Sequence, residues 1–306
     1  MKGLHPRISV IIPTKNEEKS IRGVIEQTEA ALEGVDHQII VVDASTDETP
    51  TLAIRAGAEL IKQVGNGGVG EALIQAFYWV KGDFVIFFDA DGTYDPKDIH
   101  KLMEPLFNND ADLVNGNRFF DMEKGAMPFG NKLGNIFLTQ VGNVLFHTRI
   151  KDSQSGMKAF RRVMLTRVTL WERGFPFCSE IIAEASKLGM RITEVGISYR
   201  KRIGKTKLNP ANAGLKIFWA SLRMMRDYDP LFLFLEIGLA LEIVGLIVAW
   251  PVIVEYIEYG TFRLIGRAMI AVLCWFSGLL SIFAGIILEG FNYSVKKIEA
   301  RLGQGK

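Results

Sequence analysis

Two apolar segments near the C-terminus constrain the fold more than any other feature of the sequence. They are LFLFLEIGLALEIVGLIVAW (231–250) and AMIAVLCWFSGLLSIFAGIIL (268–288). Each is close to the ~20 residues that an α-helix needs to cross the hydrocarbon core of a bilayer, so we predict two transmembrane helices. The alternative is a buried hairpin of a soluble protein, which Glu236 and Glu242 favour because ionised carboxylates are costly in lipid.

The residues around these segments predict their orientation. The link 251–263 holds one Arg and two Glu, whereas basic residues flank the pair on its outer sides: Arg223, Arg226, Lys296, Lys297 and Arg301. By the positive-inside rule, we predict an integral membrane protein with two spans, whose large N-terminal domain and both termini are cytoplasmic. The apolar stretch of MKGLHPRISVII (1–12) is too short for a signal peptide. Ser277, Ser281 and Gly285 predict close helix packing, in the hairpin or in a homo-oligomer.

The remainder of the chain has the composition of a soluble domain. Mean hydropathy is +0.16 although 23% of the residues are charged, which means that the apolar excess is concentrated in the two segments. A net charge of +2 gives no support to nucleic-acid binding. Cys178 and Cys274 are the only cysteines, which excludes a disulfide framework and a Cys-rich zinc site.

Short apolar runs alternate with helical patterns before the apolar segments. The runs are rich in Val, Ile or Phe, as is typical of buried parallel strands, and lie at 8–12, 38–42, 58–64 and 83–88. Helical patterns lie between them at 16–32, 46–56 and 70–81, the first with Asn16 as a candidate cap. The alternation predicts an α/β fold with a doubly wound sheet, whose ligand crevice lies beyond the carboxyl ends of the strands.

Polar segments follow three of these predicted strands, namely PTKNEE (13–18), DASTDET (43–49) and DADGTYDP (89–96). The carboxyl ends of parallel strands meet at one edge of a sheet, so we expect the three segments to converge. Asp89 and Asp91 can address one hard cation, and Mg²⁺ is usually held by one or two carboxylates together with substrate phosphates. An isolated Asp-x-Asp is more often a turn or a helix cap, and the neighbouring motifs favour the metal site here.

The motifs IPTKNEE, VVDASTDET and FFDADG, in this order, resemble the inverting GT-A glycosyltransferases of family 2. GNRF (116–119), DSQSGMKAFRR (152–162), FCSEIIAEASKLG (177–189) and VGISYRKRIGKTKL (195–208) resemble the subfamily of dolichyl- or polyprenyl-phosphate sugar synthases, whose prototype is dolichol-phosphate mannose synthase. The resemblance covers about residues 7–210. It implies a GT-A catalytic domain at 1–210. The amphipathic pattern, the apolar segments and the basic residues then predict an interfacial amphipathic helix at 211–228, a transmembrane hairpin at 229–290 and a basic cytoplasmic tail at 291–306.

The resemblance also implies the donor and metal sites. The nucleotide-sugar-binding residues it indicates are Pro13, Lys15, Glu17, Val42, Asp43, Asp89, Ala90, Asp91, Arg202 and Lys207. Asp91 is the main expected ligand of Mg²⁺ or Mn²⁺, with Asp89 bridging metal and ribose. Thr93 stands where the family often has glutamine, so Thr93, Asp95 and water are all candidates for the next ligand. Asp47 is either part of this site or only the cap of its helix.

The acceptor site is implied in the same way, by Arg118, Lys132 and Asn135. Asp89, Asp91, Arg118 and Arg202 form the expected catalytic set. A lipid phosphate monoester, with a second pKa of about 6, is already largely dianionic at neutral pH, so a catalytic base is optional. Glu180 is then a base, a sugar-orienting residue or an ordinary acid of a helix N-terminus.

Two amphipathic helical patterns favour a lipid acceptor. Residues 212–226 carry Leu215, Phe218, Trp219, Leu222 and Met225 around one face, and residues 129–146 form a second candidate. Such helices lie in the membrane interface, although plain core helices give the same pattern.

We therefore predict inverting transfer of a hexose from a nucleotide sugar, of the GDP-mannose or UDP-glucose type, to dolichyl or polyprenyl phosphate. One alternative is a family 2 enzyme with a carbohydrate or glycolipid hydroxyl acceptor, although the Gln-x-x-Arg-Trp signature of the processive group is absent. Another is a non-catalytic membrane scaffold, for which Thr93 is the only hint. The motifs do not distinguish the base, the sugar, the lipid length or the oligomeric state.

Overall fold

The computed structural model describes residues 7–65, 68–170, 172–174, 176–204, 215, 218, 219, 222, 223, 226, 230–261 and 263–303, with the side chains of 293 and 296–303 left out. Contacts divide the chain into two units, Met1–Ser221 and Leu222–Lys306, and each is described by itself. Lys207 and most of the predicted interfacial helix lie outside the described residues.

The first unit is built on one seven-stranded sheet with the order β3-β2-β1-β4-β6-β5-β7. All neighbouring pairs are parallel except those of β6, which runs antiparallel to β4 and β5. The predicted mostly parallel α/β sheet is confirmed. The strands are β1 (Ile8–Thr14), β2 (His37–Asp43), β3 (Glu59–Lys62), β4 (Phe84–Phe87), β5 (Leu113–Met122), β6 (Lys158–Arg161) and β7 (Ile192–Tyr199).

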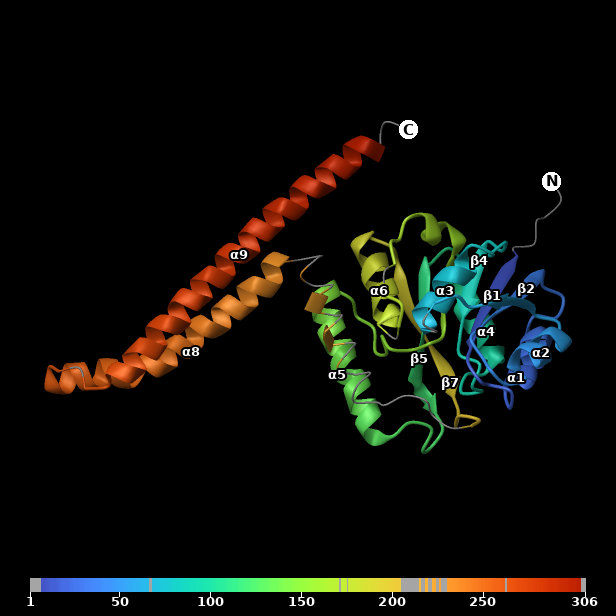
Figure 1. Ribbon diagram of the computed structural model, residues 1–306, viewed down its shortest axis with the longest axis horizontal. Helices are drawn as coiled ribbons and strands as arrows, with labels where there is room; N and C mark the ends of the chain where they lie inside the picture. The colour runs from blue at the N-terminus through green and yellow to red at the C-terminus, as the bar shows by residue number, and fades with distance from the viewer. Residues whose placement is uncertain are drawn as a thin grey trace. The chain divides into compact units, whose positions relative to one another are not determined.

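Helices cover both faces of the sheet (Figure 1). Their bounds are α1 (Ile21–Ala31), α2 (Thr49–Arg55), α3 (Val69–Phe77), α4 (Ile99–Phe107), α5 (Phe129–Phe146) and α6 (Phe177–Lys187), with 3₁₀ helices η1 (Pro96–Asp98) and η2 (Arg162–Thr166). The core on one face joins the sheet to α1, α2 and α4, and the core on the other joins it to α3 and α6. This two-sided burial explains why β1, β2 and β4 read as continuous apolar runs.

Aromatic packing anchors the second core. Phe160 of β6 lies between Phe77 of α3 and Phe87 of β4, with ring centroids 5.9 and 6.4 Å away. Phe177, the first residue of α6, packs on the same two rings. Full burial of a side chain of this class contributes about 1.5–3 kcal/mol. The cluster therefore fixes the N-terminus of α6 against the centre of the sheet.

The predicted start of the first helix is wrong. The helix begins at Ile21, and Asn16 takes a left-handed backbone conformation with φ of 52° instead of capping it. The Asn16 side chain accepts a hydrogen bond from the backbone N–H of Thr46, 2.8 Å away. Asn16 thus joins the loops that follow β1 and β2, because asparagine tolerates this conformation better than most residues.

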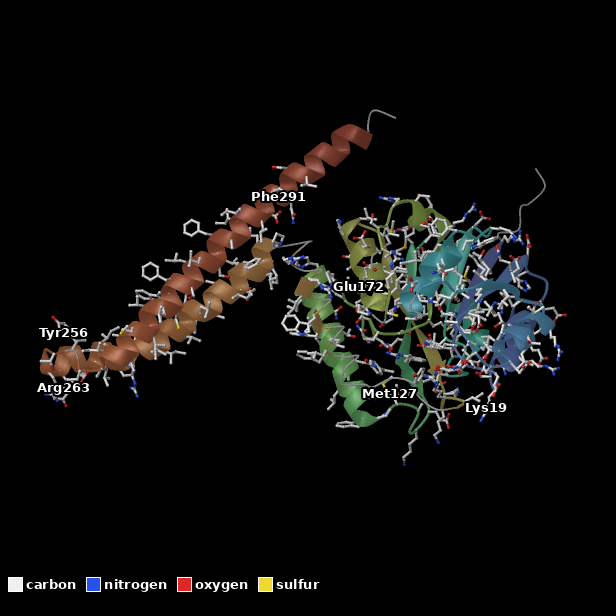
Figure 2. The ribbon with its side chains drawn as sticks, in the orientation of Figure 1. Lys19, Met127, Glu172, Tyr256, Arg263 and Phe291 are labelled. Carbon is white, nitrogen blue, oxygen red and sulfur yellow. The ribbon has the colours of Figure 1, made fainter. Side chains whose placement is uncertain are left out.

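The second unit is a hairpin of α8 (Pro230–Tyr259) and α9 (Ile265–Gly303), which lie side by side (Figure 1). Both helices are long and apolar enough to cross a membrane. Only 11% and 17% of their most apolar windows are buried, so neither is the core helix of a soluble fold. Figure 2 shows Tyr256 and Arg263 at the turn of the hairpin. Two such helices indicate a membrane-anchored protein.

Small residues at seven-residue spacing form the hairpin contact. The buried positions are Gly238, Gly245 and Val252 on α8 and Ala271, Gly278 and Gly285 on α9. A Cβ on Gly278 would lie 3.0 Å from the backbone oxygen of Gly238, which shows how closely the two backbones approach. Ser277 of the predicted four-residue stripe is exposed and lies outside this contact, which repeats every seven residues, so packing of Ser277 in a homo-oligomer stays a prediction. Ser281 and Gly285 do lie in the contact, and Ser281 Oγ donates to the Phe234 carbonyl.

Helix α5 has an exposed apolar face. Its buried residues are Leu138, Thr139, Gly142 and Phe146. Its other side exposes Phe129, Leu133, Ile136, Phe137 and Val144, each by at least 36% of its surface. A plain core helix would bury these side chains, so that interpretation of the pattern is wrong. The described residues of the other amphipathic segment, among them exposed Leu215 and Trp219, are helical.

Candidate active site

The three polar segments meet at the carboxyl edge of the sheet. Strands β1 and β2 end in register at Thr14 and Asp43, and Thr14 Oγ1 donates to Asp43 Oδ1 over 2.7 Å. Asp89 follows β4, which is the other neighbour of β1. The parallel order of β2, β1 and β4 therefore brings the predicted nucleotide and metal residues together.

Hydrogen bonds join the loops after β1 and β2 to each other. Ser45 donates through its backbone N–H and its hydroxyl to the Asp43 carboxylate, and the Glu17 N–H donates to Thr49 Oγ1. Asp47 accepts from the backbone and hydroxyl of Thr49, the first residue of α2, so it serves as a helix-start acid. Val42 and Ala90 are buried, which leaves mainly their backbone atoms for a ligand, whereas Pro13 is half-buried and Lys15 is exposed.

Asp89 and Asp91 stand in different surroundings. Asp91 is buried, and its Oδ1 accepts from the backbone and the hydroxyl of Thr93 at 3.0 and 2.6 Å. Burial raises the pKa of Asp89 to about 7, and the negative charge of Asp91 adds to this shift, while Arg118 and Arg202 oppose it. The repulsion between these two carboxylates favours a cation between or beside them.

A cationic side chain already contacts this pair. Arg202 Nη1 lies 3.2 Å from Asp91 Oδ2, and its Nη2 donates to Glu17 Oε1 over 2.7 Å. The backbone holds the arginine there, because the Ile203 N–H donates to the Asp91 carbonyl and the Arg200 N–H donates to that of Thr93. Arg202 therefore links the segment after β7 to the loops after β1 and β4.

The residues of this edge fit a divalent ion. Asp91, Asp89 and Thr93 offer hard oxygen donors, and the guanidinium of Arg202 is a stand-in cation on Asp91. Among the described residues, no group of three or more His, Cys, Asp or Glu side chains is arranged to hold a metal alone. That donor set matches Mg²⁺ or Mn²⁺ held partly by substrate phosphates and water. Asp95 instead accepts from the Lys97 N–H and caps η1.

Arg118, in β5, has a carboxylate partner that the sequence did not reveal. Its Nε and Nη2 each donate to the Asp152 carboxylate over 2.7 Å, and its backbone N–H donates to the same group. Both side chains are buried, and the guanidinium also lies 5.4 Å from the ring centre of Tyr199. Asp152 thus fixes the arginine in one orientation. Nη1, which does not bond to Asp152, can then donate to a ligand.

The other predicted acceptor residues lie on α5. Lys132 Nζ lies 5.6 Å from the ring centre of Phe119, the residue after Arg118 in β5. Asn135 Nδ2 contacts Met127 Sδ at 3.5 Å, and Figure 2 labels Met127 just before this helix.

Glu180, in the first turn of α6, is buried and accepts from the Glu172 N–H. That position suits a helix-start acid.

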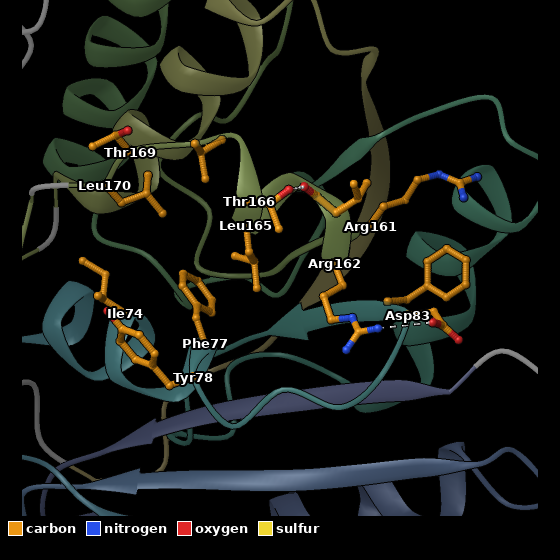
Figure 3. A pocket seen from close by; sticks show the side chains of 13 residues that line it. Ile74, Phe77, Tyr78, Asp83, Arg161, Arg162, Leu165, Thr166, Thr169 and Leu170 are labelled. Atoms are coloured by element: carbon orange, nitrogen blue, oxygen red, sulfur yellow. Dashed lines mark hydrogen bonds and ion pairs between the residues drawn. The ribbon is translucent and has the colours of Figure 1, made fainter. Parts of the chain in front are cut away.

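A hollow of about 870 Å³ lies elsewhere in this unit. Ile74, Phe77, Leu165 and Leu170 line it together with Asp83 and Arg161 (Figure 3). Asp83 precedes β4 and Arg161 ends the antiparallel β6, so the hollow lies at the amino edge of the parallel strands. Substrates of such sheets bind at the opposite edge, where the acidic pair is.

Several residues that shape the site were missed by sequence reasoning. Asp152, Gly156 and Lys158 all belong to DSQSGMKAF, a motif whose separate residue roles do not follow from the sequence alone. A Cβ on Gly156 would lie 2.8 Å from Asp89 Oδ2, and the Gly156 N–H donates to the Tyr94 hydroxyl. The concentration of Asp, Ser, Gly and Lys in so short a stretch was the available signal.

The sheet order, the linked loops after β1 and β2 and the acidic pair after β4 define the GT-A class of nucleotide-sugar-dependent transferases. The sequence profile described as Glycosyl transferase family 2 matches residues 9–169, more than half of the chain. The chain therefore belongs to glycosyltransferase family 2, and the predicted family and enzyme class are confirmed.

Relatives and solved structures agree with this membership. The low-salt glycan biosynthesis hexosyltransferase Agl6 of Haloferax volcanii is 36% identical, over 80% of this chain and 60% of the relative. The dolichyl-phosphate hexose transferase of the same organism is 32% identical, over 69% of this chain and 90% of the relative. Glucosyl-3-phosphoglycerate synthase from Mycobacterium tuberculosis, solved with Mn²⁺, UDP-glucose and phosphoglyceric acid, shares the fold with a TM-score of 0.60 at 24% identity, over 72% of this chain and 80% of that one.

Proposed function

We propose that this glycosyltransferase moves a hexose from a nucleotide sugar to dolichyl or polyprenyl phosphate, with inversion at the transferred carbon. The observation that carries the proposal is the combination of the acidic pair at the carboxyl edge with a buried arginine, Arg118, that is fixed to present a donor. A hydroxyl acceptor needs a base to accept its proton, whereas a phosphate needs cations. The similarity to a dolichyl-phosphate hexose transferase supports the same acceptor.

The nucleotide lies against the joined loops after β1 and β2. Pro13, Lys15, Glu17, Val42 and Asp43 would contact its base and ribose. Asp89, Ala90 and Asp91 lie where the diphosphate reaches the acidic pair. Arg202 turns from Asp91 towards the diphosphate, and Lys207, outside the described residues, is expected to assist it.

Asp91, Asp89 and Thr93 would hold the Mg²⁺ or Mn²⁺ ion. When bound, the ion neutralises charge that develops on the departing diphosphate. Once Arg202 has turned from Asp91, its positive charge acts on the same oxygens. Transfer ends when the acceptor oxygen has replaced the nucleotide at the sugar carbon, on the face opposite the leaving group.

The acceptor phosphate lies between Arg118 and Lys132, with Asn135 nearby. Its phosphate group is already largely dianionic at pH 7, with a second pKa of about 6, so its oxygen attacks without losing a proton to the enzyme. Glu180 then orients the donor sugar or the 172–174 segment and need not act as a base.

The exposed apolar face of α5 supports a lipid acceptor. Phe129, Leu133 and Phe137 are exposed on the helix that also carries Lys132 and Asn135. An amphipathic helix of this kind lies in the plane of the headgroups, so the polyprenyl chain can stay in the bilayer while its phosphate enters the site. We propose that the domain and both termini are cytoplasmic. Labelling of a cysteine placed in the 260–263 link by an impermeant reagent, added from outside, tests this orientation.

One assay tests the proposed reaction. The full chain is purified in lipid nanodiscs and incubated with Mg²⁺ or Mn²⁺, phytanyl phosphate and radiolabelled nucleotide sugars, including GDP-mannose and UDP-glucose. We expect label in the organic phase with one donor, dependent on the divalent ion. Label that appears only in a water-soluble product would favour a hydroxyl acceptor, and no consumption of any donor would favour a non-catalytic scaffold.

A further inference from the structure

Lys158, the first residue of β6, is a fully buried lysine that the proposed reaction does not use. Its Nζ donates to Asn115 Oδ1 at 2.7 Å, to the Ser155 carbonyl at 2.6 Å and to the Ser153 carbonyl at 3.2 Å. These three acceptors match the three N–H bonds of an ammonium group. No carboxylate among the described residues is within ion-pair distance of it, and burial lowers its pKa.

A buried ammonium bound only by neutral groups is costly, and an apolar side chain of similar length would fill the space without that penalty. Two of its three acceptors are backbone carbonyls of one tight turn, residues 152–156. Carbonyls that point inward together repel one another unless a cation lies between them. The lysine therefore determines the conformation of this turn.

The 152–156 turn carries the partner of Arg118. The Asp152 carboxylate accepts from Nε, Nη2 and the backbone N–H of Arg118, while the Asp152 carbonyl accepts from Asn115 Nδ2. Asn115 thus bonds Lys158 through its oxygen and the turn through its nitrogen. An unbroken series of buried hydrogen bonds leads from the ammonium group to the guanidinium.

Glu194 of β7 secures the same network from the other side. Its Oε1 accepts from Asn115 Nδ2 and from the Asp152 N–H, each over 3.0 Å. The turn also reaches both neighbouring helices, because the Ser153 N–H donates to Thr139 Oγ1 of α5 and Gln154 Nε2 donates to Ser179 Oγ of α6. The turn is therefore the junction of the two helices with β5 and β6.

We propose that Lys158 is a positioning residue that holds the 152–156 turn so that Asp152 presents the guanidinium of Arg118 to the acceptor phosphate. The inference rests on the proposed function for the role of Arg118. A displacement of about 1 Å at a reacting group can cost roughly 10²-fold in rate, so a small relaxation of the turn is enough to matter.

Lys158→Met removes all three donors while keeping the length of the side chain. We expect kcat/KM for phytanyl phosphate to fall by roughly 10²-fold, mostly through KM for this acceptor, while the Kd of the nucleoside diphosphate, measured by calorimetry, changes less than threefold. Phe160→Leu is the matched control, because Phe160 is equally buried in the same strand but belongs to the apolar core. A loss of activity that follows the loss of thermal stability equally in both variants would overturn the proposal.

A double-mutant cycle with Asp152→Asn separates positioning from a general structural role. If Lys158 acts through Asp152, the double variant loses little more acceptor kcat/KM than Asp152→Asn alone, whereas independent effects would multiply and contradict the proposal. Should Lys158→Met fail to fold, Lys158→Gln, which keeps two N–H donors, replaces it in the same cycle. We again expect the double variant to lose little more acceptor kcat/KM than Asp152→Asn alone. The wild-type protein is assayed alongside the variants. If it does not use phytanyl phosphate, the proposed function fails, and this outcome is distinct from a failure of the proposed role of Lys158.

Discussion

Gly156 limits the space around the acidic pair. A Cβ at this position would lie 2.8 Å from Asp89 Oδ2 and 3.0 Å from the Tyr94 hydroxyl, closer than ordinary contacts allow. The Tyr94 hydroxyl is held, because Tyr94 is buried and accepts from the Gly156 N–H. An added methyl group must therefore displace the carboxylate or the turn.

Gly156→Ala is expected to displace Asp89 and to lower kcat by at least about tenfold, with a loss of about 1–3 kcal/mol in the free energy of unfolding from overpacking. Gly23→Ala is the control, since a Cβ there meets nothing within 4 Å. Steady-state kinetics and denaturant unfolding of the two variants measure the difference. Wild-type kinetics in Gly156→Ala would mean that Asp89 tolerates movement.

Asp91→Asn keeps the shape of the side chain and removes its charge. We expect transfer to fall by at least about 10²-fold, because a preorganised group that stabilises developing charge is lost. Asp83→Asn is the control, since Asp83 lies at the opposite edge of the sheet with 61% of its side chain exposed. A near-normal rate for Asp91→Asn at any concentration of Mg²⁺ or Mn²⁺ would contradict its role as the main metal ligand.

At the residue scale, the sequence predicted what local motifs encode. Asp89, Asp91 and Thr93 lie two residues apart, and the structure joins Asp91 to Thr93 as close neighbours. Asp152 and Arg118 are 34 residues apart and meet only because β5 and β6 are paired, so no local pattern could match them. The role of Arg118 stays a proposal, although its bidentate partner is now defined.

At the scale of elements, strand identity followed from apolar runs, but strand direction did not. Runs at β1, β2 and β4 predicted buried strands, whereas nothing in KAFR signals that β6 runs antiparallel to its neighbours. Side-chain periodicity is the same for both directions, so only the connection through the 152–156 turn and the pairing partners decide it. Helix α5 illustrates the converse case, because its pattern was evident while its exposure needed the structure.

The α5 face gives a test of membrane contact. Leu133→Glu combined with Phe137→Glu is expected to raise KM for phytanyl phosphate in vesicles by at least about tenfold, because each lost apolar contact is worth about 1.5–3 kcal/mol. The Kd of the nucleoside diphosphate should not change. Val163→Glu is the control, since Val163 is 60% exposed but lies on η2. Equal effects of Val163→Glu would show a general response to added charge.

The hairpin offers two adjacent positions with opposite surroundings. Gly278→Ile is expected to separate α8 from α9 and to destabilise the hairpin by about 1–3 kcal/mol, because its Cβ would lie 3.0 Å from the Gly238 carbonyl. Ser277→Ile, at an exposed position, should leave stability unchanged. Thermal unfolding of both variants in detergent makes the comparison. If Ser277→Ile were the damaging change, the helix contact would lie on the other face, as in an oligomer.

At the scale of the whole molecule, the position of Arg202 determines how the protein responds to metal removal. Its guanidinium lies against Asp91 and Glu17, which are contributed by the loops after β4 and β1. Chelation with EDTA should therefore abolish transfer while leaving the unfolding temperature unchanged within about 1 °C. At a Mg²⁺ concentration equal to its Kd, added stability is only about 0.4 kcal/mol. Unfolding on chelation would instead mark the ion as a structural element.

The same arginine bears on the folding of a newly made chain. Asp91 and Glu17 have a counter-charge supplied by the polypeptide itself, so we expect the domain to fold in a compartment poor in divalent ions. The folded protein would then stay inactive until the ion and the donor bind.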